Sequence, residues 1–318
     1  MLNKKLVLTS AFVVMAFAQS FAADLNSLIP AKANLIAKFN IEKICAIPEL
    51  KAKFEEFKAS QPVANTSTTD ELYKDTKSAM FFLDLDTANN TDQNNIFAGA
   101  LLDGKYDVSK ITEAIKKDHA NDKGLKIENE GNCTCFTFTD EKGMTGKVAF
   151  LDSENIVVGT VLGVDAVKAV KFQKAETISA NKPFAEAVAK ITNNSSIALT
   201  TAMPQAATAL LAAQPEAQPL SKMQYIRLEL DKPNDLKIII SADADTKENA
   251  ASASQYVTKF INEFKKSTGA NEALSDLLNN AKVTDKDNTM TIESSVSDAS
   301  LKKLIESNGS PNPQIETK

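Results

Sequence analysis

The 318-residue chain has few of the residue types that carry chemistry in enzymes and metalloproteins: it contains no tryptophan, one histidine and three cysteines. Arginine occurs once, at Arg227, so lysine supplies nearly all of the positive charge. A metal site built from several histidines is therefore excluded. Cysteine is too scarce for the disulfide framework of a small secreted domain, so a hydrophobic core has to hold the fold.

The charge balance argues against a nucleic-acid partner. The formal net charge is -5 at pH 7. Binding to a phosphate backbone needs a concentrated basic face, and arginine, the preferred bidentate ligand of phosphates and bases, is nearly absent. We therefore expect no nucleic-acid partner.

The first residues have the order of an export signal. Two lysines at positions 4 and 5 precede an uncharged apolar run over residues 6–18, and small residues follow up to Ala22. This order predicts a signal peptide, residues 1–22, that is cleaved after Ala22. The apolar run is shorter than the roughly 20 residues that a transmembrane helix needs. We expect a periplasmic or secreted protein without a membrane span in the mature chain.

The remaining sequence repeats a unit of apolar strand, short polar cap and amphipathic helix. It occurs as IFAGALLDGKYDVSKITEAIKK, NIVVGTVLGVDAVKAV, LKIIISADADTKENAASASQYVTKFINEF and TMTIESSVSDASLKKLIES. An aspartate at each helix start is expected to accept hydrogen bonds from the first-turn amides, at Asp107, Asp165, Asp245 and Asp298. Asp245 with Glu248 also fits the spacing of a capping box.

Strands also follow strands directly, which decides the fold class. The stretch FTFTDEKGMTGKVAF predicts a hairpin in which Gly143 supplies a turn position. Such a pattern favours α+β architecture with mainly antiparallel sheets over a doubly wound parallel sheet, which needs strict alternation. The helices should pack on the sheets through apolar stripes. These stripes are Leu50, Phe54 and Phe57; Phe184, Val188 and Ile191; Tyr256, Phe260 and Phe264; and Leu274, Leu278 and Ala281.

The second half of the chain echoes the first. Both ANLIAKFNIEKICAIPELKAKFEEF and SIALTTAMPQAATALLAA run from an apolar strand through a proline into a helix. We interpret this as an internal duplication that gives two related α+β lobes, residues 23–180 and residues 181–306. The polar residues 307–318 are expected to form a disordered tail.

This layout resembles a loose group of uncharacterised exported bacterial proteins with duplicated α+β halves. Their halves begin with an apolar strand that leads into a short helix, and later carry a hydrophobic strand, V-V-G-T and a short helix. The matching stretches are residues 33–44 and 156–170, and the similarity extends over most of the mature chain. The resemblance implies a fold and a compartment. It implies no site residue, because the group has no established activity.

The stretch ENIVVGTVLGVDAV places Gly159 and Gly163 where an apolar strand meets a helix. It has neither the lysine of a phosphate-binding Walker loop nor the glycine spacing of a dinucleotide-binding loop. Asp165 would also repel a bound phosphate. We interpret the two glycines as flexible backbone points at a strand-to-helix turn.

Two isolated signals point to hydrolytic chemistry. His119, in KKDHAND, lies in a hydrophilic stretch and is expected to be an exposed loop residue, whereas a catalytic-triad histidine is held by packing and by a third group. Ser300 and Lys303 match S-x-x-K, the nucleophile motif of penicillin-binding enzymes, but the companion S-D-N and K-T-G motifs are absent.

Acidic runs begin at Asp84, Asp243 and Asp285, but none has the glycine and glutamate positions of an EF-hand loop. Helix caps and solvated turns explain them better, and an irregular cation site around Asp84 and Asp86 is left open.

Three interpretations of Cys45, Cys133 and Cys135 are open: small apolar core residues, one disulfide-bonded pair, or reactive thiols. Cys133 and Cys135 should point to the same face of a strand, where a direct bridge would be strained.

These observations predict an exported, non-catalytic protein that binds a protein, an envelope component or a small ligand. We expect no cofactor and assign no catalytic, cofactor-binding or metal-binding residue. The alternative is an exported hydrolase that uses Ser300 with Lys303, or a carboxylate pair that the sequence does not reveal.

Overall fold

The computed structural model describes residues 25–48, 51, 75–88, 90–120, 124–131, 133–140, 143–191, 195–232, 234–266 and 272–308. The expected signal peptide and the stripe of Leu50, Phe54 and Phe57 lie outside these residues. The chain divides into two compact units, of which the first ends at Pro204 and the second begins at Gln205. Within the described part of the chain, no helix combines the length and apolarity that crossing a bilayer requires.

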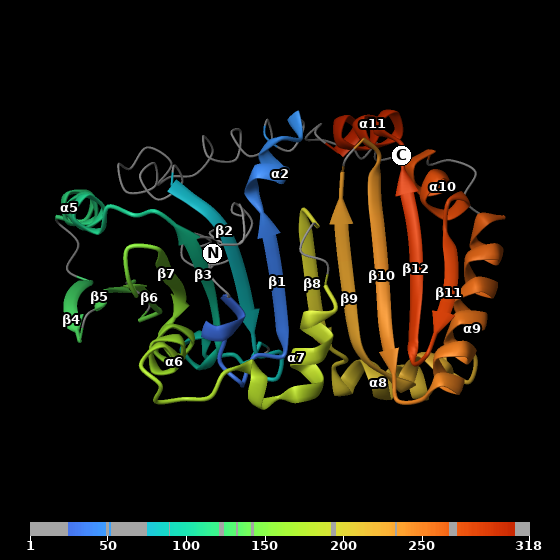
Figure 1. Ribbon diagram of the computed structural model, residues 1–318, viewed down its shortest axis with the longest axis horizontal. Coiled ribbons are helices and arrows are strands. Elements are labelled where there is room, and N and C mark those ends of the chain that lie inside the picture. The colour runs from blue at the N-terminus through green and yellow to red at the C-terminus, as the bar shows by residue number, and fades with distance from the viewer. Residues whose placement is uncertain are drawn as a thin grey trace, which may run out of the picture. The chain divides into compact units, whose positions relative to one another are not determined.

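The first unit contains an antiparallel sheet with the strand order β8-β1-β2-β3-β7-β6-β5-β4 (Figure 1). The strands are β1 (Leu35–Asn40), β2 (Thr76–Leu83), β3 (Ala98–Gly104), β4 (Leu125–Glu130), β5 (Cys133–Thr139), β6 (Thr145–Phe150), β7 (Asn155–Thr160) and β8 (Ile197–Ala202). The helices are η1 (Leu25–Leu28), α2 (Ile41–Cys45), η2 (Gln93–Asn95), α5 (Val108–Asp118), α6 (Val161–Lys171), η3 (Ile178–Ala180) and α7 (Lys182–Ala189).

Helices cover both faces of this sheet. On one face, Ile111 of α5 joins Phe136 and Phe150 in a buried cluster. Lys147 is three residues from Phe150 on β6 and so points to the opposite face, where its Nζ lies 2.7 Å from Asp165 of α6. The middle strand β3 is consequently buried at six successive residues. Continuous burial is typical of a strand that is covered on both sides.

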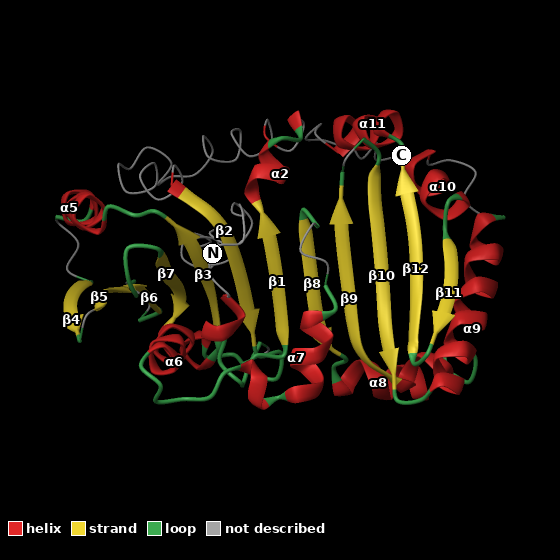
Figure 2. Ribbon diagram, in the orientation of Figure 1, coloured by secondary structure: helices red, strands yellow, loops and turns green. Residues whose placement is uncertain are grey.

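The second unit contains the antiparallel strand order β11-β12-β10-β9. These strands are β9 (Met223–Asp231), β10 (Leu236–Ala244), β11 (Lys282–Lys286) and β12 (Thr289–Val296). The helices are α8 (Gln205–Ala212), η4 (Gln218–Lys222), α9 (Lys247–Lys265), α10 (Glu272–Asn279) and α11 (Asp298–Asn308). Figure 2 shows α9 and α10 beside β11 and β12, in agreement with the packing contacts of both helices.

One face of the second sheet is apolar and the other is polar. Ile240 pairs with both Leu228 and Ile292, so these three side chains share a face. Ser294, on the same face, donates a hydrogen bond to the carbonyl of Leu277, which places α10 there. On the opposite face, the hydroxyl oxygens of Ser241 and Thr291 lie 3.2 Å apart. The side chains of the apolar face are buried or half-buried, and the polar face includes the buried residues Arg227, Glu229 and Asp243.

The predicted α+β class with antiparallel sheets is confirmed. Phe184, Val188 and Ile191 are buried as expected, and Gly143 adopts a φ of +79° in the predicted hairpin. The expected lobe boundary between residues 180 and 181 differs from the observed division after Pro204. Strand β8, which that boundary gives to the second lobe, pairs with β1 of the first unit. Helix α11 includes the first two residues of the expected tail, and residues 309–318 lie outside the described part.

Only one of the four expected aspartate caps is confirmed. Asp107 caps α5 by accepting a hydrogen bond from the amide of Lys110 at 3.0 Å. The other three predictions, and the capping box of Asp245 with Glu248, are wrong, because a hydroxyl-bearing residue directly before the helix takes the cap position. The observed side-chain acceptors are Thr160 for the amide of Gly163, Thr246 for that of Asn249, and Ser297 for that of Ser300.

The expected core-facing stripe of α9 is also wrong. Phe260 and Phe264 are 52% and 41% exposed. The buried residues of α9 are instead Ala250, Ala253, Ser254 and Ile261. Small side chains let the helix backbone approach its neighbours closely, so the larger aromatic residues near its C-terminal end remain in contact with solvent.

Candidate functional site

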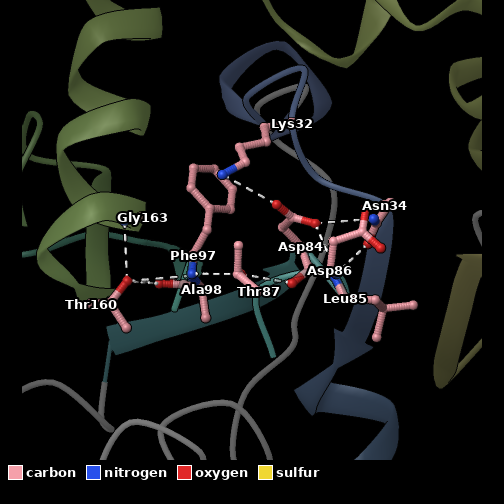
Figure 3. A network of polar contacts seen from close by, with 10 residues as sticks. All are labelled: Lys32, Asn34, Asp84, Leu85, Asp86, Thr87, Phe97, Ala98, Thr160 and Gly163. Carbon is pink, nitrogen blue, oxygen red and sulfur yellow. Dashed lines mark hydrogen bonds and ion pairs between the residues drawn. The ribbon is translucent and has the colours of Figure 1, made fainter. Parts of the chain in front are cut away.

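The acidic run that begins at Asp84 forms a closed polar network (Figure 3). The carboxylate of Asp84 is buried, and its Oδ1 accepts hydrogen bonds from Asn34 Nδ2 and from the amide of Asp86, both at 3.1 Å. Its Oδ2 lies 3.2 Å from Lys32 Nζ. The negative charge is thus already neutralised by a lysine of the same network.

The same network holds together three segments of the first unit, namely residues 32–34, residues 84–87 and Phe97. Thr87 Oγ1 donates to the carbonyl of Asp84 at 2.8 Å and accepts from the amide of Phe97 at 2.9 Å. Lys32 Nζ lies 5.3 Å from the centroid of the Phe97 ring, within the range of a cation–π interaction. Among the described residues, no group of three histidine, cysteine, aspartate or glutamate side chains is placed to hold a metal ion. We therefore interpret the network around Asp84 as structural, because its contacts hold these segments together.

Gly159 and Gly163 lie at the strand-to-helix junction, as predicted, because β7 ends at Thr160 and α6 begins at Val161. Their role differs from the predicted flexibility. A Cβ atom on Gly163 would lie 2.1 Å from the carbonyl oxygen of Ala98, and one on Gly159 would lie 2.5 Å from the same atom. Neither has a positive φ. The glycines let α6 and β7 contact the backbone of β3, and Thr160 Oγ1 donates a further bond to Ala98 at 3.1 Å (Figure 3).

The structure does not bring Ser300 and Lys303 together as a nucleophile and a base. Ser300 is buried, and its hydroxyl donates to Asp276 Oδ2 at 2.6 Å, while Ser297 donates to the same oxygen at 2.7 Å. Lys303 is exposed. The hydrogen bonds from Ser300 and Ser297 lower the pKa of Asp276. This cluster ties the start of α11 to α10 and leaves the Ser300 proton committed to a carboxylate.

The histidine and the cysteines occupy structural positions. The predicted exposed loop position of His119 is wrong, because this residue is half-buried at the end of α5 and contacts the Phe138 ring edge-on at a centroid distance of 5.2 Å. All three cysteines are free thiols. Burial raises the pKa of Cys133 and raises that of Cys135 to about 11, which disfavours the reactive thiolate. Of the three alternatives, the bridged pair is not found among the described residues, and Cys133 and Cys135 are buried core residues.

A cluster of four charges joins α6 to the strands beneath it. Lys147 and Lys168 are buried, whereas Glu130 and Asp165 are partly exposed. Lys147 Nζ lies 3.2 Å from Glu130 and 2.7 Å from Asp165, and Lys168 contacts the same two carboxylates. Burial lowers the pKa of Lys168, and the nearby charge of Glu128 opposes the shift. Both lysines are thus paired with carboxylates of the fold, and we interpret the cluster as structural.

The guanidinium group of Arg227 is paired with the carboxylate of Asp243. It is buried on the polar face of the second sheet, where its two terminal nitrogens bind the two carboxylate oxygens of Asp243, with Nη2 at 3.0 Å from Oδ1. Thr289 donates a further hydrogen bond to Asp243 Oδ1 at 2.6 Å. A bidentate pair of this kind is a structural link rather than an anion-binding site.

The second unit exposes apolar side chains on two helices. Helix α8 has no buried residue, and Leu210 is 67% exposed. On α9, the rings of Phe260 and Phe264 stack at a centroid distance of 5.7 Å with an interplanar angle of 16°. We call these two residues the α9 aromatic pair. Among the described residues, Leu210 and Phe260 have the largest exposed fractions of the large apolar side chains. Exposed apolar groups that lie together mark interaction sites more often than polar clusters that are paired within the fold.

Sequence reasoning missed the exposed helices for an identifiable reason. The α9 stripe was recognisable, but helical spacing says only which residues share a face. For α8 a usable signal existed, since residues 202–215 contain no charged side chain. A surface segment of that length without charge is unusual in a chain in which 24% of the residues are charged.

Comparison with known proteins leaves the function open and supports the fold. No protein-family model matches the chain, and no curated protein matches it. The crystal structure of TP0453, in its crystal form I, is similar to this chain with a TM-score of 0.50 and 11% sequence identity. The alignment covers 92% of this chain and 100% of TP0453. A likeness at this identity shows a shared fold.

Proposed function

We propose that the chain is an exported, non-catalytic protein that binds a protein partner through the α9 aromatic pair, with the apolar helix α8 as a second contact surface. The observation that carries the proposal is the exposure of two stacked phenylalanines on a packed, regular helix. Burial of a phenylalanine side chain contributes roughly 1.5–3 kcal/mol. Aromatic anchors of this kind dominate the energetics of protein interfaces.

The surroundings of the pair favour a protein over the other two candidate ligands. The side chains of Lys259 and Glu263 are 68% and 63% exposed beside the two rings, and their charged atoms lie 3.9 Å apart. An apolar centre with a rim of both charges is typical of a protein interface. Glu263 reduces the positive charge that the lysines at positions 259, 265 and 266 would otherwise present to an anionic lipid surface. Small-molecule sites are concave, whereas this surface is the outer face of a helix.

The surroundings of the candidate nucleophiles support a non-catalytic role. Ser300 donates to Asp276, and the thiols of Cys133 and Cys135 are buried with raised pKa values. Export is supported by the lysines, apolar run and small residues that precede Ala23 in the sequence. Internal duplication, which motivated the two related lobes, remains a proposal alongside export.

Site-specific crosslinking tests the contact surface. A photo-crosslinking residue placed at Phe264 should capture one defined partner in the native compartment. The same residue at Gln255, an exposed position on the opposite side of α9, should not capture it. The captured material should begin at Ala23 if the signal peptide has been removed.

A surface variant completes this test. Phe260→Ser should strongly reduce capture from position 264, whereas Gln255→Ser should leave it unchanged. Equal capture from both positions, or capture that Phe260→Ser does not affect, contradicts the proposed surface. A product that retains the first 22 residues contradicts export without bearing on the surface.

A further inference from the structure

A buried polar pair connects β3 to β7 in the first unit. Asp103 is 2% exposed and Asn155 is 6% exposed. The two residues are register partners in the antiparallel pair. Their side chains therefore point to the same face, with Cβ atoms about 5 Å apart.

Each of these side chains has one oxygen without a hydrogen bond. Among the described residues, neither Asp103 Oδ2 nor Asn155 Oδ1 has a partner, although Ser78 bonds to the Asp103 carboxyl group. A buried acceptor without a donor is costly, and two at one register position call for an explanation.

The orientation of the Asn155 amide is fixed by its neighbour. Its Nδ2 donates to Asp152 Oδ1 at 2.9 Å, and its backbone amide donates to the same oxygen at 2.7 Å. Rotation of the amide by half a turn would set its oxygen against the Asp152 carboxylate. Asn155 Oδ1 can therefore accept a hydrogen bond. Asp103 can donate one to it only when its carboxyl group is protonated.

Burial is the main factor that favours the neutral acid at Asp103. Burial raises its pKa most, the carboxylates of Glu154 and Asp152 raise it further, and Lys77 and the bond from Ser78 oppose the shift. Asp152 is itself paired with Lys171 of α6, so this lysine is engaged elsewhere. Tyr106 also lies near Asp103 and near the carboxylate of Asp75, and burial raises its pKa, so it stays neutral.

We propose that Asp103 is held as the neutral acid in the folded protein and donates its proton from Oδ2 to Asn155 Oδ1, so that one proton satisfies both buried oxygens. The pair then acts as a pH-sensitive clasp between β3 and β7. Loss of the proton leaves a buried carboxylate facing an amide oxygen and loosens this end of the two strands. The proposal is independent of the proposed binding function.

The sign of the pH effect follows from linkage. A carboxyl group whose pKa is higher in the folded state than in the unfolded chain contributes stability that is complete below the unfolded pKa. That contribution is lost as the pH rises through the folded pKa. Between the two pKa values, the unfolding equilibrium constant rises by up to about tenfold per pH unit.

Asp103→Asn tests the clasp, because asparagine has nearly the shape of the protonated acid and its amide can donate to Asn155 at any pH. Urea unfolding of the full mature chain should show the wild-type midpoint falling relative to that of the variant as the pH is raised from mildly acidic to alkaline. Infrared spectra of the wild type at mildly acidic pH, above the ordinary pKa of an aspartic acid, should contain the carbonyl band of a buried carboxylic acid. This band should be missing from the variant.

Parallel pH profiles of the two proteins, or a wild-type spectrum without that band, would overturn the proposal. The spectrum of the wild type decides the question even if Asp103→Asn does not fold. A divalent cation is the competing occupant of the two oxygens. Added calcium or magnesium that raises the wild-type midpoint, and does not raise that of Asp103→Asn, would replace the clasp by a cation site.

Discussion

In the first unit α5 and α6 cover opposite faces of the sheet, whereas in the second unit helices cover the apolar face and the other face stays polar. The first unit buries large aromatic side chains such as Phe136 and Phe150 between its layers. In the second unit, the buried residues of α9 itself are mostly small, and the α9 aromatic pair is exposed. The largest exposed fractions of apolar side chains, 67% at Leu210 and 52% at Phe260, occur in the second unit, whereas among the described residues of the first unit the highest value for a large apolar side chain is 44%, at Leu162.

The largest expected difference compares two phenylalanines. Phe136→Ala should lower the free energy of unfolding of the first unit by about 3–5 kcal/mol, because it removes a fully buried ring. Phe260→Ala should cost the second unit less than about 1 kcal/mol, because its ring is already half in water. Hydrogen exchange of core amides in each unit separates the two effects. Equal losses would show that the exposed aromatic pair also holds the fold.

The polar face of the second sheet gives the next comparison. Asp243→Ala leaves Arg227 buried without its partner and should cost about 3–5 kcal/mol of unfolding free energy, measured by denaturant unfolding. The double variant Arg227→Met with Asp243→Leu replaces both charges by apolar groups and should recover much of that loss. A double variant as unstable as the single one would show that the charges themselves are needed on this face.

Close backbone approach in the first unit predicts a smaller effect. Gly163→Ala should destabilise by about 1–3 kcal/mol, because the added Cβ meets the carbonyl oxygen of Ala98 at 2.1 Å and a backbone atom cannot move aside alone. Gly146→Ala is the matched control, since its Cβ would meet its nearest neighbour at 3.8 Å. Thermal unfolding of both variants gives the comparison. If Gly163→Ala is as stable as the wild type, close backbone approach does not explain this glycine, and the flexible turn predicted from the sequence does.

Most strands were predictable because one or both faces are apolar, but two were missed. These are β4, LKIENE, and β11, KVTDK, each of which pairs with a neighbour on one side only within the described residues. Edge strands are exposed and carry charges, so the apolar alternation that reveals a strand is absent from them. Their existence follows from the neighbouring strand, which lies elsewhere in the sequence.

The candidate sites were less predictable than the fold. Helical spacing identified the apolar stripe of α9, but which of its residues are buried depends on small side chains at Ala250 and Ala253 that bring the helix close. Likewise the pairing of Asp103 with Asn155 depends on the register of β3 against β7. Local pattern contains no information on either of these contacts between distant segments.

The composition of the two edge strands has a consequence for the behaviour of the protein in concentrated solution. An exposed strand edge offers free amides and carbonyls to any similar strand of another molecule, and so can start the growth of ordered aggregates. Both ends of β11 are exposed lysines. Docking of two such edges would bring like charges together, which keeps each copy of the chain from extending the sheet of the next.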